Sequence, residues 1–125
     1  MMKSFSFLWI DLSIKVLFNP EADPAIMTRQ PNGSVKPEKG RPAYIGLGHE
    51  LIHALREVLG SMEKEEETRY FIGPRGERRR ETAEREEFET VGLPGFEWDI
   101  TENDLRREHG RKERGAYGYG EEVDQ

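Results

Sequence analysis

The amino-acid sequence predicts an α+β fold, in which a short strand or hairpin region at residues 5–43 is followed by a helix at 44–60 and at least two further helices. Residues with apolar side chains alternate with other residues early in the chain, which is typical of strands. At 44–60 the apolar spacing becomes helical, and later segments at 77–92 and 101–119 carry further helices. We expect one domain over residues 1–125.

The composition limits the class of protein. Of the 125 residues, 34% are hydrophobic and 35% are charged, so the core must be small relative to the surface. The formal net charge of −6, with both signs mixed throughout, argues against a nucleic-acid binder. No apolar run approaches the ~18–20 residues that cross a membrane, so no membrane partner is expected. Because the chain lacks cysteine, a metal would have to be held by histidine and carboxylate side chains.

The region 5–43 predicts strands that end before a proline-rich stretch. A short signal peptide is the alternative for the first residues, but a small-residue cleavage site is missing and Asp11 interrupts the apolar run. Asn32-Gly33 is a strong turn signal, and it predicts a weak hairpin or an ordered loop. The alternating residues on which the strand prediction rests are Phe5, Phe7, Trp9, Leu12, Ile14, Val16 and Phe18.

The helix at 44–60 is the clearest in the chain, and Gly60 marks its end. His49 and His53 form a stripe beside its apolar face, at the edge of the core, and Gly48 allows another element to approach closely. The apolar face consists of Leu47, Leu51, Ile52, Leu55, Val58 and Leu59.

This helix contains the pattern H-E-x-x-H, formed by His49, Glu50 and His53. Two histidines four residues apart lie one above the other on a helix, so both imidazoles can reach one metal ion. The glutamate beside the first histidine can hold a metal-bound water and take its proton. In a chain of this size the pattern arises by chance on the order of one time in a few hundred.

The remaining segments are more polar. Residues 63–89 are dominated by charge and predict a solvated surface, split by a loop at 73–76 before the second helix at 77–92. A third helix is expected to begin at Thr101, whose hydroxyl can cap it together with Asp104, and to end at Gly110. The Gly-rich, acidic tail at 115–125 is expected to fray.

A catalytic zinc site needs a third protein ligand besides the two histidines. Metzincins supply a third histidine after the motif, but Arg56 and Leu59 stand where that extension has glycine and histidine. The only other histidine, His109, lies near the end of a charged helix and is expected at the surface. The third ligand is therefore expected to be a carboxylate from a following helix, as in gluzincins.

On the helix at 77–92, Glu87 falls inside an otherwise uncharged arc. Burying a carboxylate without a partner is costly, and a zinc ion would supply that partner. We therefore predict Glu87 as the third ligand of Zn²⁺, with Glu86 and Glu84 as alternatives; a salt-bridged Glu87 is the structural alternative.

The predicted chemistry follows from these positions. Zinc held by His49, His53 and Glu87 would lower the pKa of its water, and Glu50 would take the proton as that water attacks a peptide carbonyl. A second donor would stabilise the oxyanion. Tyr117 and Arg114 are the candidates because both lie in the C-terminal motif of the family resemblance given next, although a tail tyrosine without a role fits the pattern equally well.

Three separated blocks of this sequence resemble the NleD-like zinc metalloprotease effectors of bacterial pathogens. They are residues 47–55, residues 86–92, and residues 100–106 with Glu108, Gly110, Arg114 and Tyr117. The resemblance implies a minimal zincin-like metalloprotease fold and a soluble protein delivered into a host cell by a type III secretion system. It also implies a host protein substrate, with mitogen-activated protein (MAP) kinases as the substrates of NleD-like members. Glu102, Asn103 and Arg106 belong to the third block, where helix capping and packing is the default expectation.

The expected function is that of a monomeric zinc endopeptidase, a secreted effector or toxin that cleaves host proteins. Two alternatives remain from the sequence. The low apolar fraction also fits a zincin-like binding module without activity, and the same residues could serve a zinc hydrolase of a non-peptide bond. The substrate cannot be read from the sequence, because specificity lies in the shape of the cleft.

Overall fold

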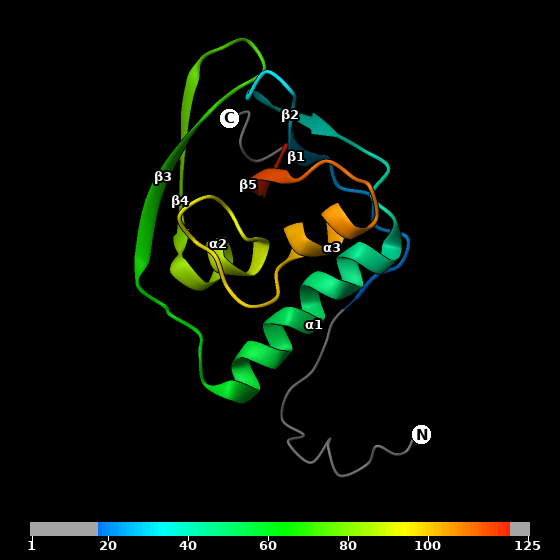
Figure 1. Ribbon diagram of the computed structural model, residues 1–125, viewed down its shortest axis with the longest axis vertical. Helices are drawn as coiled ribbons and strands as arrows, with labels where there is room; N and C mark the ends of the chain where they lie inside the picture. The colour runs from blue at the N-terminus through cyan, green and yellow to red at the C-terminus, as the bar shows by residue number, and fades with distance from the viewer. Residues whose placement is uncertain (1–17, 121–125) are drawn as a thin grey trace.

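The computed structural model describes residues 18–120, and these residues form an α+β fold, as predicted. The strands expected at residues 5–17 lie outside the described residues. Three strands form one antiparallel sheet in the order β2-β1-β5, while β3 and β4 form a separate antiparallel pair (Figure 1). The elements are β1 (Ile26–Arg29), β2 (Val35–Glu38), α1 (Ala43–Leu59), β3 (Glu66–Ile72), β4 (Arg78–Glu84), α2 (Arg85–Val91), α3 (Glu102–Glu108) and β5 (Arg114–Tyr119).

The hairpin expected around Asn32-Gly33 is confirmed as the β1–β2 connection. Gly33 adopts a φ of 90°, in the region that favours glycine. The side chain of Asn32 accepts hydrogen bonds from the backbone N–H and the hydroxyl of Ser34, at 3.0 and 2.7 Å. The turn is therefore fixed by local chemistry that is visible in the sequence.

The helix α1 agrees with the expected range and ends at Gly60, which has a φ of 68°. Its buried face, however, is only partly the predicted one. Ile52 is buried as expected, but Leu51, Leu55, Val58 and Leu59 are exposed, and the buried side also carries Ile45, Gly46, His49 and Arg56. The reason is that α2 and α3 offer buried carboxylates on that side, which pair with His49 and Arg56. These pairs satisfy polar groups that apolar periodicity alone would place at the surface.

The close approach expected at Gly48 is also present. A Cβ atom at Gly48 would lie 2.6 Å from a methyl group of Leu105, so α3 packs directly across α1 at this point. In Figure 1, α3 lies between α1 and β5. The H-E-x-x-H pattern of α1 is thereby brought against α3.

The prediction of one helix at 77–92 is wrong in its first half. Residues 78–84 form β4, which pairs with β3 around a turn at 73–76, and only residues 85–91 form α2. The glutamates and arginines of this segment favour helix locally, but cross-strand contacts outweigh that preference. One example is the pair formed by Arg69 and Glu81, whose side chains lie 3.0 Å apart on opposite strands.

The third helix begins as predicted. The Thr101 hydroxyl accepts from the backbone N–H of Asp104 at 3.2 Å, and the Asp104 carboxylate accepts from the backbone N–H of Thr101 at 3.0 Å. These reciprocal bonds form the capping box of α3.

The expectation that the tail frays from residue 115 is wrong, because residues 114–119 form β5. Glu81 of β4 explains part of this order, since its carboxylate accepts hydrogen bonds from the backbone N–H groups of Tyr117 and Gly118 at 2.9 and 3.0 Å. The other edge of β5 pairs with β1. Residues 121–125 lie outside the described part of the chain.

The apolar core is small and divided. One cluster joins the two sheets, and the other packs α2 against the loop that follows it. Within residues 18–120, no helix is long and apolar enough to cross a membrane. The first cluster consists of Met27, Val35, Phe71 and Ala116, and the second of Phe88, Val91 and Leu93, with Ala83, Phe96 and Tyr117 packed against it.

We predict that Thr101→Ala lowers the free energy of unfolding by about 1 kcal/mol, because the first turn of α3 loses its side-chain acceptor. Urea denaturation followed by circular dichroism measures the change. Thr101→Ser retains the hydroxyl and is the matched control. Equal stability of the alanine and serine variants would contradict a stabilising role for the cap.

Candidate metal centre

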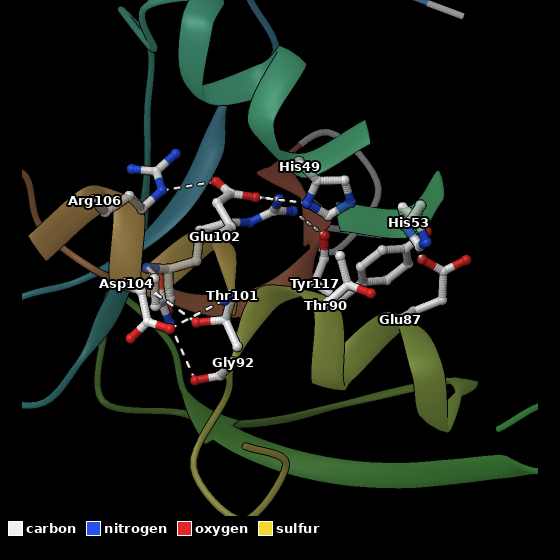
Figure 2. Close-up of polar contacts among 12 residues, drawn as sticks. His49, His53, Glu87, Thr90, Gly92, Thr101, Glu102, Asp104, Arg106 and Tyr117 are labelled. Atoms are coloured by element: carbon white, nitrogen blue, oxygen red, sulfur yellow. Dashed lines mark hydrogen bonds and ion pairs between the residues drawn. The ribbon is translucent and has the colours of Figure 1, made fainter. Parts of the chain in front are cut away.

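Three predicted residues converge on one cavity from two helices. His49 and His53 extend from α1 and Glu87 from α2, and one ligand atom from each lies within 4.8 Å of the others. The two imidazole rings are 4.8 Å apart between centroids, and Figure 2 shows both beside the Glu87 carboxylate. The cavity has a volume of about 450 Å³, and its lining also includes Glu50, Glu86, Arg114 and Tyr117.

His49 is oriented by a carboxylate behind it. Its Nδ1 atom lies 2.7 Å from Oε1 of Glu102, and both side chains are buried. Burial alone would raise the pKa of Glu102, but the charges of Arg114, His49 and Arg106 hold that pKa well below its usual range. A charged Glu102 favours the proton on Nδ1 of His49, which leaves Nε2 available as a metal ligand.

His53 has the same arrangement with other partners. Its Nδ1 lies 3.0 Å from Oε1 of Glu86, and its Nε2 lies 3.0 Å from Oε1 of Glu87. Burial tends to lower the pKa of His53, yet the two carboxylates outweigh burial and raise the pKa to about 10. Glu86, an alternative third ligand from the sequence, thus lies behind His53, whereas Glu87 faces the nitrogen that points to the cavity.

The donor set fits a metal ion. Oε1 of Glu87 is buried and lies at ion-pair distance, 3.0 Å, from Nε2 of His53. A tetrahedral zinc ion at its usual bond lengths keeps neighbouring ligand atoms about 3.3 Å apart, close to the 3.0 Å between these two atoms. Two imidazole nitrogens and one carboxylate oxygen form a common catalytic zinc set.

Glu50 and Tyr117 lie at the same cavity. Glu50 follows His49 on α1, is half-buried and lines the cavity. Tyr117 reaches the cavity from β5, where its ring also contacts Phe88. Burial and the neighbouring Glu87 carboxylate raise the pKa of Tyr117 above its ordinary value, so its hydroxyl keeps its proton at neutral pH.

Arg114 also lines the cavity, but its guanidinium is engaged elsewhere. Nη1 donates to Glu102 at 2.8 Å, Nε donates to the carbonyl of Ala116 at 3.3 Å, and Nη2 donates to the carbonyl of Tyr117. Arg114 therefore holds Glu102 and the β5 backbone in place. Of the two candidates for a second donor, Tyr117 is the better placed.

The remaining candidates lie away from the cluster. Glu84, the other alternative third ligand, precedes α2 at its N-cap position and is not among the residues that line the cavity. His109 is exposed, as expected, and its ring lies 4.9 Å from that of Tyr44.

Glu102, Asn103 and Arg106 stand in the third sequence block, but the sequence does not predict how they support the candidate centre. Glu102 orients His49, and Nε of Arg106 donates to the second carboxylate oxygen of Glu102 at 2.7 Å. Asn103 fastens α3 to β5, because its side chain accepts from the backbone N–H of Arg114 at 2.7 Å and donates to the carbonyl of Arg114 at 3.1 Å. The four-residue spacing of Glu102 and Arg106 was the available signal, since it predicts an ion pair on a helix.

Comparison with known proteins agrees with this geometry at the level of the family. The model of the Peptidase_M91 family, described as effector proteins, matches residues 13–117, which is most of the chain. Neither the curated proteins nor the solved structures give a match. The match covers the helix with both histidines, the helix with Glu87 and the strand with Tyr117, and the chain therefore belongs to the Peptidase_M91 family of effector proteins.

Proposed function

We propose that this protein is a zinc-dependent endopeptidase whose metal is held by His49, His53 and Glu87. The convergence of these three side chains on one cavity, with Glu50 in the same wall, is the observation that carries the proposal. When bound, zinc would act as a Lewis acid towards a peptide carbonyl and would lower the pKa of water to near neutrality.

In this mechanism Glu50 is the general base. Its half-buried carboxylate would accept a proton from the attacking water and return it to the leaving amine. Glu102 and Glu86 position the two histidines, because each contacts Nδ1 of one imidazole and leaves Nε2 directed towards the cavity.

Tyr117 is the proposed donor to the oxyanion. Its raised pKa keeps the hydroxyl protonated, as a hydrogen-bond donor requires. Arg114 contributes indirectly, since it binds the carbonyl of Tyr117 and the carboxylate of Glu102. His49 and this donor are thus tied to one buried network.

For the substrate, we propose a host protein that the enzyme meets after delivery as a soluble monomer by a type III secretion system. Membership of an effector family supports this proposal, and the resemblance to NleD-like proteins suggests MAP kinases. Incubating the protein with host-cell lysate, with and without a zinc chelator, and mapping new N-termini tests it. Turnover of small amides or esters without protein cleavage would instead favour a non-peptide hydrolase.

We predict that Glu50→Gln leaves zinc bound but lowers the rate of peptide cleavage by about 10²-fold or more, because the base is lost while the ligands remain. Glu57→Gln is the matched control, since Glu57 also lines the cavity from α1. Zinc is measured by atomic emission. Undiminished cleavage by Glu50→Gln would refute the mechanism, and less than about half an equivalent of zinc in the parent protein would favour an inactive binding module.

A second prediction addresses the third ligand. Glu87→Ala is expected to weaken zinc affinity by at least about 100-fold, because a three-ligand site loses one of its donors. Glu84→Ala should leave the affinity unchanged, since Glu84 lies outside the cavity lining. Competition with a chromophoric chelator measures both. Equal affinities for the two variants would exclude Glu87 as a ligand.

A third prediction concerns the carboxylate behind His49. Glu102→Gln is expected to weaken zinc affinity by about 10–100-fold, because a neutral amide orients and polarises the imidazole less well. Glu108→Gln, on the exposed side of the same helix, is the control. Circular dichroism establishes that both variants are folded. A folded Glu102→Gln variant with parental zinc affinity would show that Glu102 serves only the fold.

A further inference from the structure

A second cavity, also of about 450 Å³, is lined by Arg106, the residue that donates to Glu102. It is bounded by β1, by β2 and the loop after it, and by the end of α3 with the loop that follows. The charge of its lining is opposite to that of the chain, whose net charge is −6. Its positively charged residues are Lys39, Arg41, Arg106, Arg111 and Lys112, and its one carboxylate is Glu38.

Arg106 offers an unused donor at this cavity. Its Nε donates to Glu102 at 2.7 Å and its Nη1 donates to the carbonyl of Lys112 at 3.3 Å, but its Nη2 is buried without a partner in residues 18–120. The residue is 4% exposed, so water is a poor substitute for that partner. The guanidinium is held in place by these two bonds.

The other cations of the cavity are only partly balanced. Lys112 lies 3.2 Å from Glu38, which also accepts from Thr28, so this carboxylate is already satisfied. Within residues 18–120, no carboxylate forms an ion pair with Lys39, Arg41 or Arg111. These cations repel one another and Arg106 at short range, and the positive charges of Arg114 and Arg41, together with burial, keep the pKa of Arg106 below its ordinary value.

The position of Arg41 is set by the helix beneath it. A Cβ atom at Gly46 would lie 3.0 Å from Nη2 of Arg41, so the guanidinium rests in the space that this glycine leaves on α1. Arg41 and Arg106 thus approach the cavity from two elements, as in a site that surrounds an anion. The planar guanidinium group of arginine presents paired N–H donors whose spacing matches that of two phosphate oxygens.

We propose that this cavity binds a small soluble anion that carries two or more phosphate groups. Lys39, Arg41 and Arg111 leave three positive charges unbalanced, and two phosphate groups, at about −1.5 to −2 each, would match them. Arg106, which also lines the cavity, has one terminal nitrogen, Nη2, without a hydrogen-bond partner in residues 18–120. The volume falls within the range of roughly 300–1,000 Å³ that is usual for small-molecule sites.

Isothermal titration calorimetry of the full chain with inorganic pyrophosphate, at about 150 mM salt, tests the proposal. We expect pyrophosphate to bind at least about tenfold more tightly than orthophosphate or sulfate, because it can engage both arginines. The double variant Arg41→Gln/Arg111→Gln should weaken pyrophosphate binding by at least about tenfold. The control Arg75→Gln/Arg80→Gln removes the same charge from the exposed β3–β4 hairpin and should change binding less than about twofold.

A second measurement separates binding from folding. Pyrophosphate should raise the melting temperature of the parent and the control, and this rise should be lost in Arg41→Gln/Arg111→Gln, whose own melting temperature should match the parent. Equal binding of sulfate and pyrophosphate, or equal losses in the two double variants, would overturn the proposal as nonspecific charge attraction. Binding to vesicles that carry phosphorylated inositol headgroups without binding to pyrophosphate would overturn it in favour of a membrane ligand.

Discussion

The structure depends on one buried carboxylate, that of Glu102. It is fully buried, and its oxygens contact His49 of α1, Arg106 of its own helix and Arg114 of β5. An isolated charge at this depth would be strongly unfavourable, and only its partners make the charged form stable. Because these partners come from three elements, the same contacts that hold α1, α3 and β5 together also orient His49, the first histidine of the candidate metal centre.

A second network of the same kind joins α1 to α2. Arg56 is buried one turn beyond His53, where it donates to Glu89 at 2.6 Å and lies 4.6 Å from the ring of Trp98. Glu89 also binds Arg85, and Glu86 contacts His53 from the same helix. The apolar clusters are small, so polar pairs fill the interface that aliphatic side chains would fill in a larger domain. Such pairs define geometry more than they add stability, which suits a site that needs two imidazoles in fixed positions.

Features set by local chemistry could be predicted from the sequence. The turn at Asn32-Gly33, the end of α1 at Gly60 and the capping box of Thr101 each depend on residues close in the chain. Features set by distant partners could not. The strand β4 depends on cross-strand pairs with β3, and the order of β5 depends on Glu81, some 36 residues earlier in the chain.

In the candidate site, too, features that depend on residues close in the chain could be predicted, and features that depend on distant partners could not. The spacing of His49 and His53 places both on one helix face, and this local rule sufficed to bring them to one cavity. Glu87 converges with them although the predicted helix began too early, because the arc that contains it lies in the part of the segment that is helical. The spacing of apolar residues predicts that Leu51 and Leu55 are buried on α1, but both are exposed. His49 and Arg56 are buried instead, because they pair with carboxylates that come from other helices.

The third sequence block acquires a physical explanation from α3. Glu102 and Arg106 are one helical turn apart, and Asn103 is adjacent to the first, so all three fall on the buried side of a helix of only seven residues. One side of this helix therefore contacts three parts of the structure. Glu102 faces the candidate metal centre, Asn103 binds β5, and Arg106 lines the second cavity, whose lining is mostly positively charged. Replacing Glu102 or Asn103 would leave a buried partner unsatisfied in another element, and replacing Arg106 would remove one of the cations that balance the Glu102 carboxylate. The block is constrained as a unit because a short helix must satisfy three interfaces at once.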